Sequence, residues 1–222
     1  MIRSFITVVA CSLAAGCTAR STAESARMAS ADSARTDSIA RARQDSINRT
    51  LPGYVVDSIL PVDEEIRRFR AAIGGPAVSR LEGGSGSRDD LVQRFMRSAQ
   101  DADTAAMRRM ALSAREFADL YYLSSPYARP PYRQSPALAW KLIQSRSDAG
   151  MMAVVRRYAG RAPTVVAVRC DPRPTREGGN VIHSGCLVDV KEGTAPPLAR
   201  LLFGSIIERD GQFKFISFTN KF

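Results

Sequence analysis

The spacing of apolar residues changes once along this chain of 222 residues, and that change limits the fold more than any other feature. Between Asp89 and Gly160 apolar residues recur at steps of three and four, the period of an amphipathic helix. From Pro163 onward they alternate, which is the period of a strand. Because helices come first and strands follow, the pattern predicts an α+β domain over residues 89–222, with helices packed on a curved antiparallel sheet of about four strands.

The helical part of this domain should bury one face of each helix. The acids Asp89 and Asp90 are typical of a first turn, and the residues expected to face the core after them are Leu91, Val92, Phe95, Met96 and Ala99. Further helices are expected over residues 104–112, 113–123, 138–146 and 151–158.

Two cysteines indicate the register of a first hairpin. If residues 164–170 and 180–191 pair about Gly178, the numbers of opposed residues sum to 356. The pairs on one face are then Cys170 with Cys186, Val168 with Val188, and Val166 with Val190. Directly opposed cysteines lie at a separation that a disulfide bridges, so we predict a disulfide; two buried thiols are the alternative. A metal site is disfavoured, since His183 is the only histidine.

A second hairpin is signalled by the dipeptide Asp210-Gly211, a preferred two-residue turn, between residues 201–209 and 212–220. Its flanks are apolar on both faces, which predicts a central place in the sheet. The apolar positions are Ile206, Ile207, Phe213, Phe215, Ile216 and Phe218.

The segment before the domain has a different composition. Residues 18–50 consist mainly of Ser, Ala, Arg, Asp and Thr, with little apolar surface to bury, which predicts a disordered tether. Acids precede arginines by three or four residues, a spacing that also allows a transient solvated helix. A helix is then expected from Pro61 to the glycines at 74–75, followed by a Gly/Ser hinge at residues 83–87. The apolar side of this helix comprises Val62, Ile66, Phe69 and Ile73. We expect this side to pack on the α+β domain, in preference to binding a partner.

The first 17 residues resemble a bacterial export signal. A charged start at Arg3 is followed by an uncharged run that is shorter than the about 20 residues that span a bilayer. Residues 13–17, Leu-Ala-Ala-Gly-Cys, then resemble the lipobox of bacterial lipoproteins. That resemblance implies removal of a signal peptide (1–16) and lipidation of Cys17 with acyl chains such as palmitate. An ordinary secretory signal, or a buried N-terminal helix, is the alternative.

The expected organisation therefore has four parts: a signal peptide (1–16), a lipidated tether (17–60), an amphipathic helix with its hinge (61–88) and the α+β domain (89–222). The residue after Cys17 is Thr18 and not Asp, which resembles the signal for an outer-membrane location facing the periplasm.

The chain has 32 basic and 22 acidic residues, a net charge of +10. For an exported chain this favours anionic lipid, envelope polymer or a protein partner over nucleic acid, and a solvated arginine-rich surface is the simplest reading.

Chemistry-bearing residues are densest between positions 116 and 140. Tyrosine rings with polar tips, a tryptophan and arginines suit a ligand pocket, although several of these residues would equally serve as core. The predicted ligand-binding residues are Tyr121, Tyr122, Tyr132, Arg133 and Trp140, and the catalytic candidates are Glu116, Asp119, Tyr122 and His183. No nucleophile or cofactor motif accompanies them, so no cofactor and no metal are expected.

The order of elements over residues 89–222 resembles the NTF2-like superfamily, which includes the SnoaL and ketosteroid-isomerase groups. The resemblance implies helices followed by a bent antiparallel sheet around a conical cavity. The isomerases use a carboxylate base with a tyrosine and a protonated acid, but here the acids Glu116 and Asp119 fall on the predicted helix. Two hypotheses follow: a noncatalytic envelope lipoprotein that binds a ligand or partner, or an isomerase-like or hydrolytic enzyme with an acid and tyrosine pocket.

Overall fold

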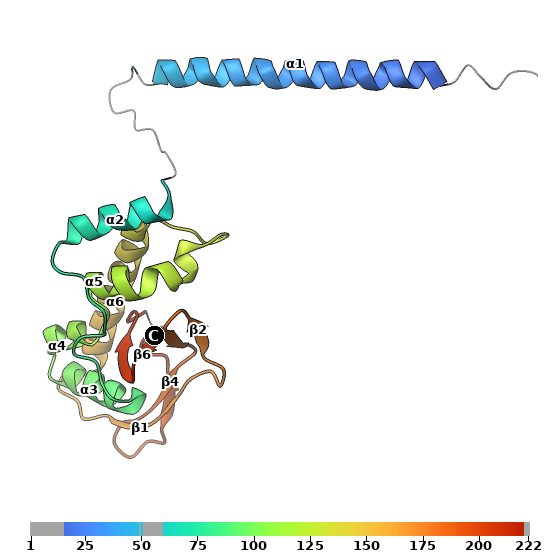
Figure 1. The fold of residues 1–222 in the computed structure, drawn as a ribbon. Coiled ribbons are helices and arrows are strands. Elements are labelled where there is room, and N and C mark those ends of the chain that lie inside the picture. Colours follow the sequence, from blue (N-terminus) through green and yellow to red (C-terminus); the bar gives the residue numbers. More distant parts are fainter. Residues whose placement is uncertain (1–15, 49, 51–59, 220–222) are drawn as a thin grey trace, which may run out of the picture. The chain divides into compact units, whose positions relative to one another are not determined.

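The computed structural model describes residues 16–48, 50 and 60–219, and the chain divides into two units, Met1–Ile59 and Leu60–Phe222. In the first unit, the described residues 16–48 form the helix α1 (Gly16–Asn48), whose described side chains are all exposed (Figure 1). This helix is the ordered form that the acid-to-arginine spacing allows for the predicted tether. Residues 1–15 of the predicted signal peptide (1–16) lie outside the described part. Among the described residues, no helix combines the length and apolar character needed to cross a membrane.

The second unit begins with helices (Figure 1). They are α2 (Val62–Ile73), α3 (Arg88–Gln100), α4 (Thr104–Arg109), α5 (Ala114–Glu116) and α6 (Pro136–Tyr158), with a π-helical turn η1 (Phe117–Tyr121) and 3₁₀ turns η2 (Tyr122–Ser124) and η3 (Pro126–Ala128). Serine side chains cap the amino ends of α3, α5 and α6. The expected helices α2 and α3 are confirmed. All five predicted core residues of α3 are buried.

Helix α6 corrects one prediction, because it is a single helix of 23 residues where two short helices were expected. The expected break lay near Gly150, and glycine inside a helix costs about 1 kcal/mol relative to alanine. Both halves of α6 are buried against the rest of the unit: Ile143 contributes to one core and Val154 to another. This burial outweighs the local preference of the glycine, which is itself buried.

Seven short strands follow and form two antiparallel sheets, with orders β1-β4-β5 and β2-β3-β6-β7. The strands are β1 (Thr164–Arg169), β2 (Thr175–Glu177), β3 (Asn180–His183), β4 (Leu187–Lys191), β5 (Leu198–Arg200), β6 (Ile206–Arg209) and β7 (Gln212–Phe215). The expected sheet of about four strands is thus divided into two sheets.

The two sheets share their chain segments. Residues 164–177, 180–191 and 198–209 each contribute one strand to each sheet. Antiparallel pairing of the first two segments continues between the sheets through the hydrogen bond from Asp171 N to Ser184 O, 2.9 Å long. Gly185, with φ of 61°, lies where the second segment passes from β3 to β4, and a side chain there would collide with the carboxylate of Asp171.

The predicted register of the first hairpin is confirmed near the disulfide. Val168 faces Val188, and Cys170 is bonded to Cys186. The predicted pair of Val166 with Val190 is wrong, because Val190 faces Val165 instead. An irregularity between residues 165 and 167 inserts one extra residue into β1, as in a β-bulge, and leaves the side chain of Val166 exposed.

The hairpin of β6 and β7 separates two hydrophobic cores, which explains why both of its faces are apolar. Ile206 and Phe215 belong to a core with α3, α4 and the end of α6. Ile207 and Ile216 belong to a second core with α2, η1 and the start of α6. The predicted turn is also confirmed, since Arg209 pairs with Gln212.

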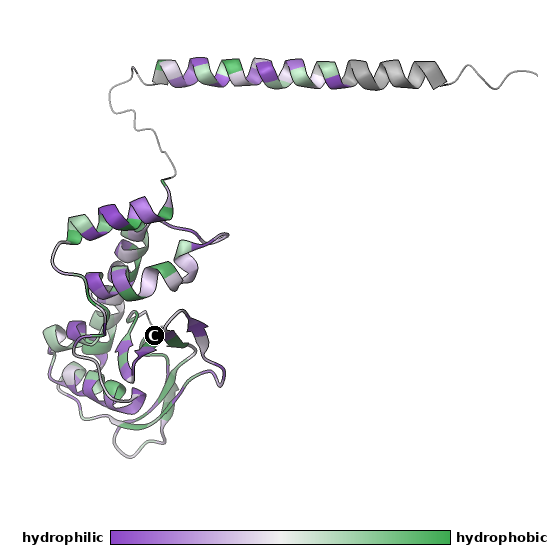
Figure 2. Ribbon diagram, in the orientation of Figure 1, coloured by the Kyte–Doolittle hydropathy of each residue, from purple (hydrophilic) through white to green (hydrophobic). Residues whose placement is uncertain are grey.

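Helix α2 packs on this second core. Its side chains Ile66 and Phe69 are buried there, and the Phe69 ring meets the Phe117 ring edge-on with centroids 5.9 Å apart. Figure 2 shows hydrophobic and hydrophilic residues mixed along α2 and α3, as expected for helices that bury one face. The predicted docking of α2 on the domain is confirmed.

Candidate functional site

Glu116, the first candidate base, is a buried structural group. Its side chain is fully buried, and its Oε2 atom accepts hydrogen bonds from Lys214 Nζ at 2.8 Å and from the backbone N–H of Ser113 at 2.7 Å. Its Oε1 atom accepts from the backbone N–H of Glu82 at 2.7 Å and from Lys214 Nζ at 3.0 Å. The carboxylate is saturated by donors and has no free lone pair directed at a cavity.

Asp119 is also held by structural partners. Its Oδ1 accepts from Arg70 Nε at 2.7 Å, and its Oδ2 accepts from the backbone N–H of Val78 at 2.9 Å. These contacts fix the end of α2 and the loop after it to η1. Asp119 therefore joins these two elements to η1.

Tyr122 and Arg133 are likewise tied to the backbone. The fully buried Tyr122 donates its hydroxyl to the carbonyl of Gln134 at 2.8 Å. The guanidinium of Arg133 donates to the carbonyl of Leu60, and its Nη2 atom lies 3.3 Å from Oε2 of Glu65. Tyr132, by contrast, is 68% exposed. The predicted ligand-binding set is therefore not assembled around one cavity.

His183 lies on β3, and its Nε2 is 2.8 Å from an Oε2 atom of Glu208 on the neighbouring strand β6. It lines a hollow beside the disulfide, together with Arg88 and Arg169. The four catalytic candidates thus have four separate partners, and the structure does not bring them together. Among the described residues, no group of three or more His, Cys, Asp and Glu side chains is placed to hold a metal ion.

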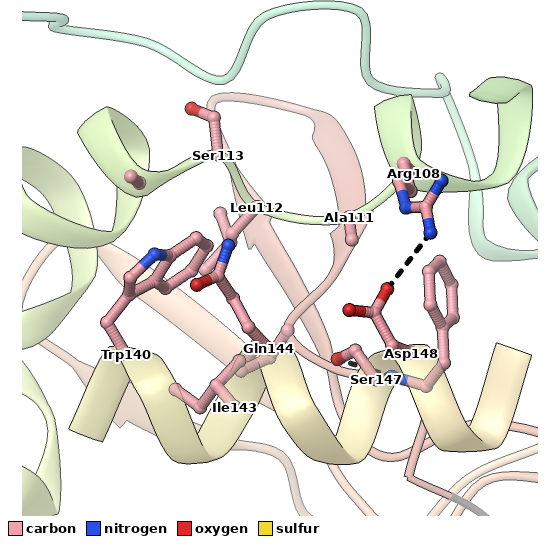
Figure 3. Close-up of a pocket in the computed structure, with 12 residues that line it drawn as sticks. Arg108, Ala111, Leu112, Ser113, Trp140, Ile143, Gln144, Ser147 and Asp148 are labelled. Atoms are coloured by element: carbon pink, nitrogen blue, oxygen red, sulfur yellow. Dashed lines mark hydrogen bonds and ion pairs between the residues drawn. The ribbon is translucent and has the colours of Figure 1, made fainter. Parts of the chain in front are cut away.

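Trp140, one of the predicted ligand residues, lines a hollow with a largely apolar floor. This hollow, the Trp140 hollow, has a volume of about 300 Å³ and lies between α6 and residues 111–114 (Figure 3). Its floor is apolar and buried, and comprises Leu112, Ile143, Ile216 and Phe218. An aromatic and aliphatic floor of this kind excludes water from one face of a bound group.

The rim of the Trp140 hollow is polar. Figure 3 shows Trp140 at one end, the amide of Gln144 in the middle, and Arg108 paired with Asp148 at the other end. That ion pair measures 3.3 Å, and both side chains are largely exposed. The indole is held by its contact with the Phe117 ring, at a centroid distance of 5.2 Å. The hollow therefore has a fixed aromatic end and a charged end that solvent reaches.

Sequence reasoning did not find Gln144, Asp148 or Arg108. Helical spacing was the available signal for the first two, because Gln144 and Asp148 follow Trp140 by four and eight residues and so share its face of α6. Arg108 carried no such signal, since only the packing of α4 against α6 brings it to this rim.

A second hollow, the Gln134 hollow, lies on the other flank of α6. It has a volume of about 250 Å³ and shares only Ile143 and Ile216 with the first. Tyr121, the other predicted ligand residue that reaches a hollow, lines it together with Tyr127, Gln134 and Arg146. The first half of α6 thus separates two hollows of different polarity.

Comparisons with known proteins add no family to this geometry: no protein-family model, no curated protein and no solved structure matches the chain.

Proposed function

We propose that this protein is a lipid-anchored component of a bacterial cell envelope, and that its α+β domain binds a ligand in the Trp140 hollow without catalysing a reaction. The observation that supports this proposal most directly is the contrast between the two kinds of site. The carboxylate of Glu116 is saturated by structural donors, and each oxygen of Asp119 accepts a hydrogen bond from a structural partner. The Trp140 hollow, in contrast, is open and combines an apolar floor with a polar rim.

The chemistry of this hollow favours a group with one apolar face. A sugar ring or an apolar side chain of an envelope polymer can lie on Trp140 and the aliphatic floor, while its polar edge meets Gln144 and the Arg108–Asp148 pair. Hydrogen-bonding groups at the rim then select the orientation of the bound group. Burial of its apolar face contributes affinity of about 25 cal/mol per Å² of apolar surface removed from water.

The fold assignment that accompanies this proposal is an NTF2-like cone for residues 89–222. Two features support it: helices precede the strands, and three bent chain segments each contribute to both sheets.

The enzymatic alternative, an isomerase or hydrolase, needs a carboxylate and a tyrosine in one pocket. Glu116 and Tyr122 are each bound to other partners, so the alternative lacks an assembled acid and base set.

Fluorescence of Trp140 tests ligand binding, because this is the only tryptophan of the chain. Titration of the full chain with soluble fragments of bacterial cell wall is expected to give a saturable change in emission. Gln144→Ala removes a rim amide and is expected to weaken the apparent affinity by about fivefold, the equivalent of one neutral hydrogen bond. Gln93→Ala, an exposed glutamine of α3, is the matched control. No saturable change with any wall fragment would contradict the proposal.

Metabolic labelling with palmitate tests the anchor. Cys17→Ser is expected to abolish incorporation of the label, because the proposed lipid is attached through that sulfur. Cys11→Ser is the matched control within the same N-terminal segment and is expected to keep the label. Equal labelling of both variants would contradict an anchor at Cys17. It would not affect the proposal that the Trp140 hollow binds a ligand, which the fluorescence titration tests.

A further inference from the structure

We propose that the Gln134 hollow binds a sugar acid, a ligand of monosaccharide size that carries one carboxylate and several hydroxyl groups. The hollow is lined by Tyr121, Tyr127, Gln134, Arg146 and Ser217 among other residues. Its volume of about 250 Å³ lies below the roughly 300–1,000 Å³ of sites for drug-sized ligands, which favours one small ring over an oligomer. This site is separate from the Trp140 hollow of the proposed function.

Gln134 supplies a hydrogen-bond acceptor. Its backbone is fixed on both sides, since its N–H donates to the carbonyl of Tyr127 at 2.9 Å and its carbonyl accepts from Tyr122 at 2.8 Å. Its side-chain Oε1 is buried and has no hydrogen-bond partner in the part of the chain that the structure describes. A buried acceptor without a partner destabilises the folded state, so a ligand that offers an O–H group there is favoured.

Tyr121 supplies a donor. Only 5% of this residue is exposed, and it lines the hollow. Burial, together with nearby Glu177 and Tyr127, raises the pKa of Tyr121 well above its usual range. The phenol therefore stays protonated at neutral pH and can donate to a ligand oxygen.

Arg146 supplies the charge. Its exposed guanidinium lines the hollow, and it forms no ion pair with any described residue. The described lining contains no Asp or Glu, so Arg146 is the one charged side chain within that lining, and Glu177 lies near Tyr121 outside it. A ligand with a single carboxylate matches that charge.

The same lining disfavours the other small ligands that carry a carboxylate. The described lining has no carboxylate to pair with the ammonium group of an amino acid, which favours a ligand with hydroxyl donors over an amino acid. A simple carboxylate such as acetate has no hydroxyl to donate to Gln134 Oε1. A ligand with both a carboxylate and hydroxyl donors offers a partner to Arg146 and to Gln134 Oε1 together.

Calorimetric titration of the full chain with D-glucuronate tests this proposal. We expect saturable binding, with D-glucose and acetate each binding at least about tenfold more weakly, because each lacks one of the two required groups. Arg146→Gln is expected to weaken glucuronate binding by about tenfold or more. Arg156→Gln is the matched control, since Arg156 is also exposed on α6 and has no ion pair among the described residues.

Three results would overturn the proposal: no saturable heat with glucuronate, equal weakening by Arg146→Gln and Arg156→Gln, or acetate binding as tightly as glucuronate. Gln144→Ala on the opposite flank of α6 is expected to leave glucuronate binding unchanged. This variant distinguishes failure at one hollow from failure at the other, because it changes only the rim of the Trp140 hollow.

Discussion

Replacing Lys214 by methionine is expected to lower the free energy of unfolding by about 3–5 kcal/mol, because it removes one partner of a buried ion pair. Lys214 is 3% exposed and donates to both carboxylate oxygens of Glu116, which is itself fully buried. Without Lys214 the carboxylate keeps its two backbone donors, from Glu82 and Ser113, but has no cation. Urea denaturation followed by circular dichroism measures the change.

The matched control for this prediction is Lys141→Met, which removes an exposed lysine of α6 and is expected to change stability by less than about 0.5 kcal/mol. Glu116→Gln leaves Lys214 without an anion and is expected to destabilise by a similar amount to Lys214→Met. The double variant is expected to cost less than the sum of the two single variants, since neither charge is then left alone. Equal stability of Lys214→Met and Lys141→Met would contradict a role for the pair.

Removing the disulfide is expected to produce the second largest effect. Cys170→Ala combined with Cys186→Ala should lower the free energy of unfolding by about 3 kcal/mol, because the bond closes a loop between residues 16 positions apart and so restricts the unfolded chain. The change should appear in the urea midpoint of the oxidised protein. Addition of reductant should lower the midpoint of the unmodified chain and leave that of the variant in place.

A thiol titration after denaturation checks the disulfide directly. In a chain with Cys11→Ser and Cys17→Ser, no free thiol is expected before reduction and two are expected after it, since the chain has four cysteines. Two free thiols without reductant would contradict the bond and would remove the reason for the expected loss of stability.

Much of the fold follows from local patterns. The period of three and four residues predicts the buried face of α3, because a helix that rests on a core must repeat its apolar side with its own geometry. Alternation in the strands, together with the positions of Cys170 and Cys186, predicts the pairing of Val168 with Val188. The continuity of α6 and the extra residue in β1 escape such patterns, because both depend on packing against elements distant in the chain.

The candidate site was less predictable than the fold. The sequence indicates that tyrosine, tryptophan and carboxylate side chains are concentrated between residues 116 and 140, and Tyr121 and Trp140 do line hollows. It does not indicate which partner each group takes. Glu116 and Lys214 are 98 residues apart, and nothing in the local pattern near either residue identifies the other.

The sequence by itself therefore determined the order of helices and strands, the turns, and the register that opposes Cys170 and Cys186. Each of these depends on periodic burial or on spacing along a short stretch of chain. Only the tertiary structure decided that Glu116 is neutralised by Lys214, and that α6 separates an apolar hollow at Trp140 from a polar one at Gln134. The physical reason is that ion pairs and hollows form between elements brought together by folding.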